Sequence, residues 1–193
     1  MIRKNNVAKR NTGFTLIETL ISVVILLIAV VGPMRIASQG ISSSIRSRDE
    51  LVAAYLAQDA IEFIRYKIIT NQNANDPLTT GLGDCLSASR CNVDTLAVNG
   101  DSSSVGRIVG CGASSCPDNL KLTTTSGGFT YYGLHDTTGT STDFRREVTI
   151  TEESTGLLGF PSEWYISATV YWGKLGENSL TVGENLVDWR VIY

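Results

Sequence analysis

The sequence predicts an α+β fold in which one long N-terminal helix packs on a C-terminal antiparallel sheet. An unbroken apolar run near the N-terminus leads into a stretch with helical periodicity, and the last third of the chain alternates apolar and polar residues as strands do. Four cysteines lie in the loop-rich region between these two patterns. The length of 193 residues suits one modest domain with an appendage.

Residues 1–13 form a short basic leader. They contain four of the 16 basic residues and none of the 19 acidic ones, so the chain without them would have 12 basic and 19 acidic residues and a net charge of −7. No later stretch combines clustered Lys and Arg with aromatic side chains. We therefore expect no nucleic-acid binding by the monomer, since such binding neutralises phosphates with clustered cations.

Residues 14–35 are predicted to form a membrane-spanning or filament-core helix. The 21 residues from Phe14 to Met34 are almost all apolar and would span about 31 Å as a helix, which matches the hydrocarbon core of a bilayer. The basic flank places the leader in the cytoplasm and the rest of the chain outside it. No small-residue cleavage site follows the run, which argues against a secretory signal peptide and leaves an uncleaved signal anchor as the alternative. Gly32 and Pro33 predict a kink or a locally melted turn.

Residues 36–70 are predicted to continue this helix in amphipathic form. Apolar residues recur at helical spacing at Ile41, Ile45, Val52, Leu56, Ala60, Ile64 and Ile68, and charged residues occupy the opposite face. We expect this stripe to pack on the sheet of the same chain. The turn-forming segment Asn71 to Pro77 should end the helix.

Residues 71–193 are predicted to form the globular head, with a cysteine-containing loop region at 78–126 and an antiparallel sheet at 127–193. Strands are expected at Phe144–Glu152, Tyr165–Trp172 and Leu186–Tyr193, with a fourth candidate at Phe129–Leu134 and a short one at Val105–Val109.

The four cysteines Cys85, Cys91, Cys111 and Cys116 suggest two disulfides and an oxidising compartment. Three pairings are possible, and proximity in sequence favours Cys85 with Cys91 and Cys111 with Cys116. A zinc site and free thiols are the alternatives. The cysteine gaps lack the usual thiolate spacing, and the single histidine, His135, is remote and is read as an exposed loop residue, so we expect no metal and no cofactor.

The junction around Gly13 resembles a known processing site. Residues 9–13 (KRNTG) followed by residues 14–18 (FTLIE) resemble the cleavage site of type IV pilins and of type II secretion pseudopilins. The resemblance implies that a prepilin peptidase cuts between Gly13 and Phe14 and methylates the amino group of Phe14. It also implies that Glu18 pairs with the N-terminal ammonium of a neighbouring subunit during assembly. A carboxylate in an apolar helix needs such a partner, although Glu18 could instead snorkel toward water.

The resemblance implies a type IV pilin-like fold and a structural function. The precursor would be a single-pass protein of the inner membrane with its head outside the cytoplasm, in contact first with lipid and the inner-membrane assembly platform and then with other pilin subunits. The mature protein would enter an extracellular pilus or a periplasmic pseudopilus. The helix around residues 55–65 resembles that of minor pilins and I-type pseudopilins, as does the final strand containing residues 187–190, which favours a minor pilin.

A type II secretion pseudopilin and a major pilin are the alternatives within the resemblance. A membrane-anchored exported enzyme or binding protein is a remote one, because the sequence has no paired nucleophile and base and no phosphate-binding loop. Residues 112–116 (GASSC) lack the closing glycine of a nucleophile elbow. We therefore expect no catalytic residues.

Overall fold

The computed structural model describes residues 13, 15–86, 89–95, 106–124, 127–134, 139–153 and 163–187. The chain divides into two compact units, Met1–Ser47 and Arg48–Tyr193, which are considered separately. The leader residues 1–12, Phe14, His135 and residues 188–193 of the last expected strand lie outside the described residues.

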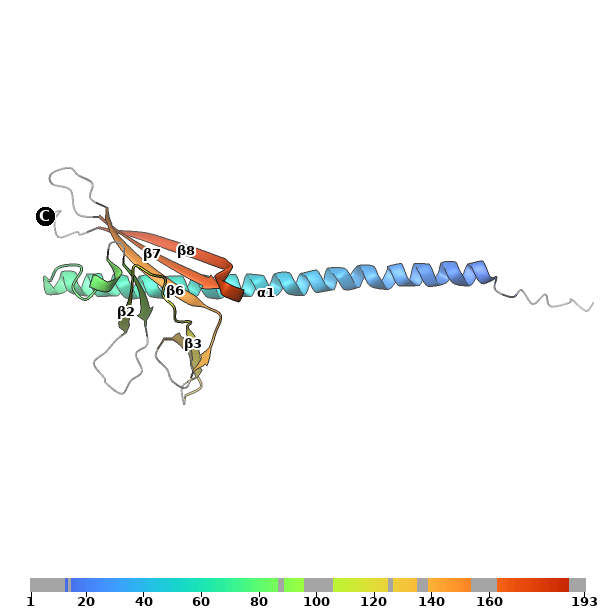
Figure 1. Cartoon of the computed structure of the whole chain (residues 1–193), viewed down its shortest axis with the longest axis horizontal. Coiled ribbons are helices and arrows are strands. Elements are labelled where there is room, and N and C mark those ends of the chain that lie inside the picture. Colours follow the sequence, from blue (N-terminus) through green and yellow to red (C-terminus); the bar gives the residue numbers. More distant parts are fainter. Residues whose placement is uncertain are drawn as a thin grey trace, which may run out of the picture. The chain divides into compact units, whose positions relative to one another are not determined.

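One helix, α1 (Leu16–Ala74), runs through both units and is shown in Figure 1. Its secondary structure is helical through Gly32 and Pro33. It ends within the segment that the sequence predicts, because Asn75 adopts a left-handed conformation (φ 64°) and the Asp76 amide turns back to the Asn71 carbonyl at 2.9 Å. The Asn71 side chain then donates to the carbonyls of Leu78 and Thr80, which fixes the exit of the chain.

The apolar stripe of α1 is buried over a shorter stretch than the sequence suggests. It enters the core of the second unit from Ala53 to Ile68, and Ala53 and Ala60 are completely buried. Ile41 and Ile45 belong to the same periodic pattern but are 64% and 57% exposed. Helical periodicity identified an apolar face here, but part of that face has no partner among the described residues.

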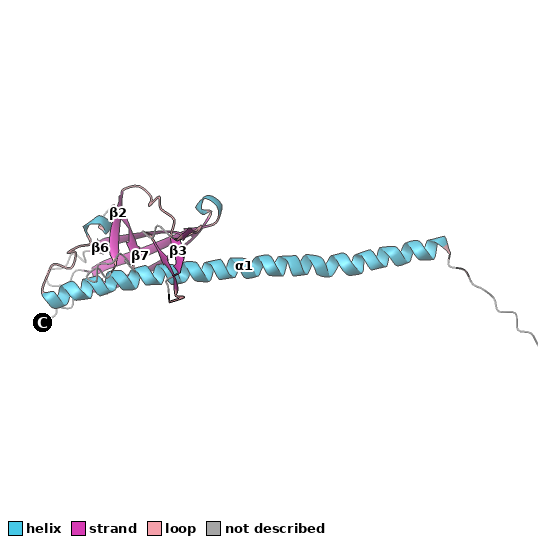
Figure 2. Cartoon of the chain, turned by 90° about the horizontal axis from the view of Figure 1, so that it is seen from below, coloured by secondary structure: helices cyan, strands magenta, loops and turns pink. Residues whose placement is uncertain are grey.

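The main sheet is antiparallel and has five strands in the order β2-β1-β6-β7-β8. These are β1 (Arg90–Asp94), β2 (Arg107–Gly112), β6 (Arg145–Glu153), β7 (Glu163–Trp172) and β8 (Asn178–Val187). The second half of α1 lies along one face of this sheet, as Figures 1 and 2 show from two directions. The core between them contains apolar residues of β6 and β7, such as Val148, Ile150 and Ile166. These core residues alternate along each strand with residues that face outward.

A smaller antiparallel sheet has the order β4-β3-β5, with β3 (Lys121–Thr124), β4 (Thr130–Gly133) and β5 (Thr140–Ser141). Two short 3-10 turns, η1 (Gly83–Cys85) and η2 (Lys174–Gly176), complete the described secondary structure. The ring of Tyr132 on β4 packs edge-to-face against the ring of Phe144, which directly precedes β6, with ring centroids 6.0 Å apart. This contact joins the smaller sheet to the main one.

The α+β prediction is confirmed, and the strands expected at 144–152 and 165–172 correspond to β6 and β7. The last strand, β8, begins at Asn178, eight residues before the strand expected at Leu186; it includes residues 186 and 187, and the rest of the expected strand lies outside the described residues. Strands β1, β3 and β5 were not predicted, since each is short and shows no clear alternation. The expected strands at 105–109 and 129–134 correspond to β2 and β4.

Two disulfides join the four cysteines in the pairing that proximity favours. Cys85 at the end of η1 is bonded to Cys91 in β1, and Cys111 in β2 is bonded to Cys116 in the loop that follows. Cys85, Cys91 and Cys116 are buried, so both bonds are packed against the head.

Candidate functional site

The N-terminal end of α1 is built by Thr15. Its carbonyl accepts hydrogen bonds from the amides of Glu18 at 3.0 Å and Thr19 at 3.2 Å, and its hydroxyl lies 3.4 Å from the Glu18 amide. This is the arrangement of a helix N-cap, in which the Thr15 hydroxyl accepts from the amide of Glu18 and the helix begins at Leu16. Glu18 therefore lies in the first turn, where the helix dipole favours a negative charge.

The other polar side chains of this turn are satisfied by the helix itself. The Thr19 hydroxyl donates to the Leu16 carbonyl at 2.8 Å, and the Ser22 hydroxyl donates to the Glu18 carbonyl at 2.7 Å. Such bonds let hydroxyl groups sit in an apolar environment without an external partner. The carboxylate of Glu18 has no hydrogen bond or ion pair among the described residues, so it is the one group of this turn left for a partner from outside them.

The first half of α1 is apolar and uncovered. Every large apolar side chain from Leu16 to Met34 is between 46% and 81% exposed. Within the described residues, α1 is the helix that is long and apolar enough to cross a membrane. A helix that is apolar all round is stable only in lipid or among similar helices, so this surface requires one of these two environments.

These features coincide with a known sequence family. Residues 8–32 match the prokaryotic N-terminal methylation motif. Over these residues the chain is similar to the N-terminal segments of prepilin-type proteins. The match supports the resemblance to type IV pilins and pseudopilins and contains Gly13, Phe14, Glu18 and Gly32. Neither a curated protein nor a solved structure matches the chain.

The methylation motif implies processing by a prepilin peptidase and assembly with other pilins. Together with the apolar helix it fits a membrane-anchored precursor. The motif is a structural one rather than an enzymatic one. In the described ranges, no group of three or more His, Cys, Asp or Glu side chains is arranged to hold a metal ion.

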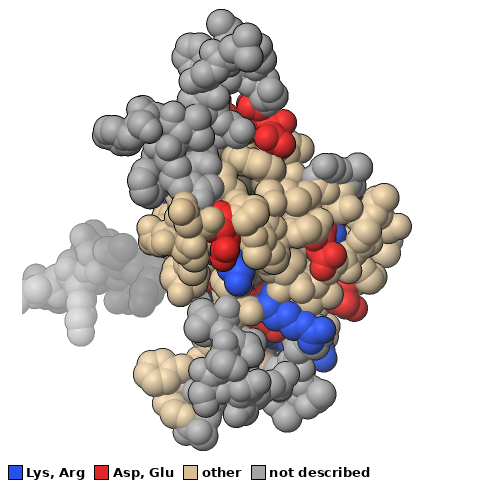
Figure 3. Space-filling view, turned by 90° about the vertical axis from the view of Figure 1, so that its left-hand side faces the viewer, with Lys and Arg blue, Asp and Glu red and all other residues tan. Residues whose placement is uncertain are grey.

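The predicted site residues are divided between the two units. Gly13 and Glu18 lie at the start of α1, Gly32 and Pro33 lie further along it, and the cysteines lie in the second unit. The disulfides therefore cross-link parts of the head. On the face of the head in Figure 3, most of the described surface is uncharged and the Lys and Arg side chains cover a small part of it.

Sequence reasoning missed a buried arginine that joins three elements of the head. Arg146 on β6 is 1% exposed, and its Nη1 donates to the Leu56 carbonyl of α1 at 2.7 Å and to Asp59 Oδ2 at 3.2 Å. Its Nη2 donates to the Val93 carbonyl of β1, and its Nε lies 3.5 Å from Asn92 Oδ1. Burial lowers the pKa of Arg146 and nearby Asp59 opposes that effect.

A second buried charge holds the outer face of the sheet. Glu147 is 4% exposed, accepts from Arg90 Nη1 at 3.0 Å, and accepts from the Cys116 amide at 3.2 Å. It thereby connects β6 to β1 and to the second disulfide.

The burial of Arg146 had one signal in the sequence, the alternation of β6. Arg146 is in phase with the buried residues Val148 and Ile150, so it faces the same side of the sheet.

Proposed function

We propose that this protein is a structural subunit of a type IV pilus or a type IV pilus-like filament. The prepilin peptidase cuts between Gly13 and Phe14 and methylates Phe14, and the apolar half of α1 passes from the membrane into the filament core. The observation that carries the proposal is the combination of the methylation motif with the uncovered apolar segment of α1, residues 16–34, whose single carboxylate, Glu18, has no partner among the described residues.

Glu18 is assigned the role of pairing with the N-terminal ammonium of a neighbouring subunit. A carboxylate in the middle of a membrane helix costs about 2.5–3.5 kcal/mol on insertion scales, and less near a helix end, so an ion pair recovers free energy that the isolated subunit lacks. Gly32 and Pro33 are assigned the bend or local melting that lets the helix adjust when it leaves the bilayer.

Within this proposal the chain is a minor pilin, and a type II secretion pseudopilin or a major pilin are its alternatives. The support is the resemblance of the helix around residues 55–65 to minor pilins and I-type pseudopilins. Counting this subunit relative to the others in purified filaments separates the classes, because a major pilin forms most of the mass.

Mass spectrometry of the cell-associated protein and of sheared filaments tests the processing step. We expect a mature chain that begins with N-methylated Phe14. A chain that retains Met1 in the presence of an active prepilin peptidase would refute the proposal.

Substitution of Glu18 by Gln tests the assembly step. We expect cleavage to proceed and incorporation into sheared filaments to fall about tenfold, which corresponds to the loss of about 1.4 kcal/mol of subunit contact. Thr19→Val is the matched control, because it removes a hydroxyl that bonds only the helix backbone and leaves the charge in place. Equal incorporation of the two variants would contradict the assigned role of Glu18.

A further inference from the structure

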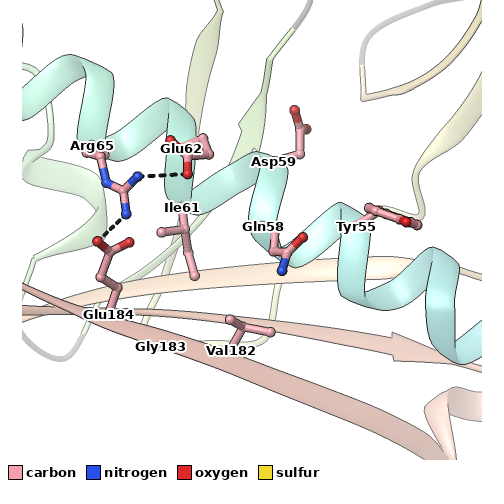
Figure 4. A pocket seen from close by; sticks show the side chains of 9 residues that line it. All are labelled: Tyr55, Gln58, Asp59, Ile61, Glu62, Arg65, Val182, Gly183 and Glu184. Atoms are coloured by element: carbon pink, nitrogen blue, oxygen red, sulfur yellow. Dashed lines mark hydrogen bonds and ion pairs between the residues drawn. The ribbon is translucent and has the colours of Figure 1, made fainter.

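A groove runs between α1 and the edge strand β8. Figure 4 shows its lining, and its volume is about 610 Å³. The buried side chain of Ile61 and the half-buried side chain of Val182 supply apolar surface, and Tyr55 and Gln58 are exposed at its rim. The groove lies wholly within the second unit.

The groove exists because one helix cannot cover the sheet. Five strands spaced about 4.8 Å apart extend for roughly 19 Å, whereas a helix with its side chains is about 10–12 Å wide. The inner face of β8 is therefore only partly covered, and Leu180, Val182 and Leu186 pack against the core without being fully buried. The strand is also an edge of the sheet, since β7 is its one neighbour among the strands that the structure describes.

Acidic residues predominate in the lining of the groove. Asp59, Glu62 and Glu184 carry three negative charges, whereas Arg65 and the buried Arg146, which donates to Asp59, carry two positive charges. Arg65 is already engaged, because its Nη1 lies 2.8 Å from Glu62 and its Nη2 bonds Glu184, and these partners raise its pKa. The surface thus favours an occupant that presents apolar side chains flanked by positive charge.

Residues 35–48 of the same sequence have this chemistry. They contain Arg35, Arg46 and Arg48 and no acidic residue. They also contain Ile41 and Ile45, the exposed members of the apolar stripe. Both surfaces, the groove and this helix segment, are thus incomplete in the single chain.

Residues 35–48 and the groove-lining residues of α1 belong to one continuous helix. Ile45 and Ile61 are 16 residues apart on α1, which corresponds to about 24 Å along a helix axis. The helix is unbroken between them. An occupant with the chemistry of residues 35–48 must therefore come from a second molecule.

We propose that the groove between α1 and β8 receives residues 35–48 of a second copy of this chain in the filament. The contact joins two different surfaces, so it continues from one subunit to the next instead of closing into a symmetric dimer. It rests on the proposed filament function and assigns a lateral contact to the head. A minor pilin, which has few copies in a filament, forms this contact wherever two of its copies are adjacent.

Charge exchange tests the electrostatic part of the contact. Arg46→Glu alone and Glu62→Arg alone should each lower incorporation into filaments by about two- to fivefold, the range expected for an exposed ion pair, and the double variant should restore it. Glu177→Arg is the control, because Glu177 is an exposed acid of the head that does not line the groove and is remote in sequence from Arg46. Rescue of Arg46→Glu by Glu177→Arg to the same extent would overturn the assignment to the groove.

Photo-crosslinking identifies the occupant. A benzoylphenylalanine replaces Gln58, which is exposed and lines the groove, in the full-length chain, and sheared filaments are irradiated and mapped by mass spectrometry. We expect products with residues 35–48 of another copy, at least about tenfold above a control with the same group at Ser179, which lies on the opposite face of β8.

Filaments that contain the chain but give products only with residues 188–193 or with a different subunit would overturn the second-copy contact while leaving the filament function intact. Equal products from positions 58 and 179 would also overturn it. Absence of even the unsubstituted chain from filaments would instead refute the filament function on which the contact rests.

Discussion

Arg146 should be a main determinant of head stability, and its replacement by Met tests this. The substitution keeps an unbranched stem but removes the guanidinium that donates to the carbonyls of Leu56 and Val93. A buried acceptor without a partner costs about 1–3 kcal/mol, and part of that is offset because the variant no longer desolvates a charge. Asp59 is 46% exposed at its side chain, so water can replace its lost partner. We therefore expect a net loss of about 2–4 kcal/mol in the free energy of unfolding.

Urea unfolding of the detergent-solubilised full chain measures this effect. All three tryptophans, Trp164, Trp172 and Trp189, lie beyond residue 163, so their fluorescence reports on the head and not on the apolar helix. With a denaturant slope of about 2 kcal/mol/M, the midpoint should fall by about 1–2 M.

Two further variants show whether the bonds of Arg146 account for that loss. Arg146→Lys should be at least as destabilising as Arg146→Met, because an ammonium keeps the buried charge but cannot reproduce the planar set of donors. Arg107→Met on the exposed side of β2 is the control and should change stability by less than about 0.5 kcal/mol. A midpoint for Arg146→Met that equals that of Arg107→Met would refute the reasoning.

Three further outcomes are expected. Non-reducing peptide mapping of the exported protein should recover the links Cys85–Cys91 and Cys111–Cys116, and four alkylatable thiols would contradict both. Glu147→Gln should lower the free energy of unfolding by about 1–3 kcal/mol in the same urea assay, because it weakens charged hydrogen bonds of a buried group; no change would show that the bonds to Arg90 and the Cys116 amide are dispensable. Gly183→Ala should lower the urea midpoint, because the added Cβ would overlap the Tyr165 hydroxyl. The added Cβ of Gly112→Ala would meet no atom within 4 Å, so only the positive φ of Gly112 opposes that substitution. Urea midpoints of both variants equal to that of the unsubstituted protein would contradict this.

The sequence was sufficient to predict the main elements of the head where packing is strong. The four-residue spacing from Leu56 to Ile68 and the alternation at Val148 and Ile150 follow directly from burial on one face, and these residues are buried in the structure. Ile41 and Ile45 fit the same spacing and are exposed, because periodicity indicates an apolar face without indicating which molecule covers it.

The parts that sequence reasoning missed have a different physical origin. The inward positions of β8 include Asn178 and Glu184, so an edge strand that is only half covered shows a weak alternation. Arg146 occupies an inward position of β6, where an apolar residue is expected. Its acceptors come from α1 and β1, which are remote in sequence, so no local pattern could reveal that the charge would be satisfied.

The charged residue that binds the second half of α1, Arg146, has partners within the chain, whereas the charged residue at the start of α1, Glu18, has none among the described residues. We therefore expect Arg146 to act in folding and Glu18 to act in assembly. Arg146 binds the helix near Leu56 and Asp59, and each of its nitrogens has an acceptor within the chain, so its buried charge acts in folding. Glu18 lies in the apolar half without a partner in the described part of the chain, although the hydroxyls beside it are satisfied by the same helix. A charge that the fold itself satisfies contributes to the stability of the monomer, whereas one that it leaves unpaired in apolar surroundings gains stabilisation only from another molecule. Substitutions at Arg146 should therefore lower the stability of the head before they affect assembly, and substitutions at Glu18 should lower assembly without lowering the stability of the head.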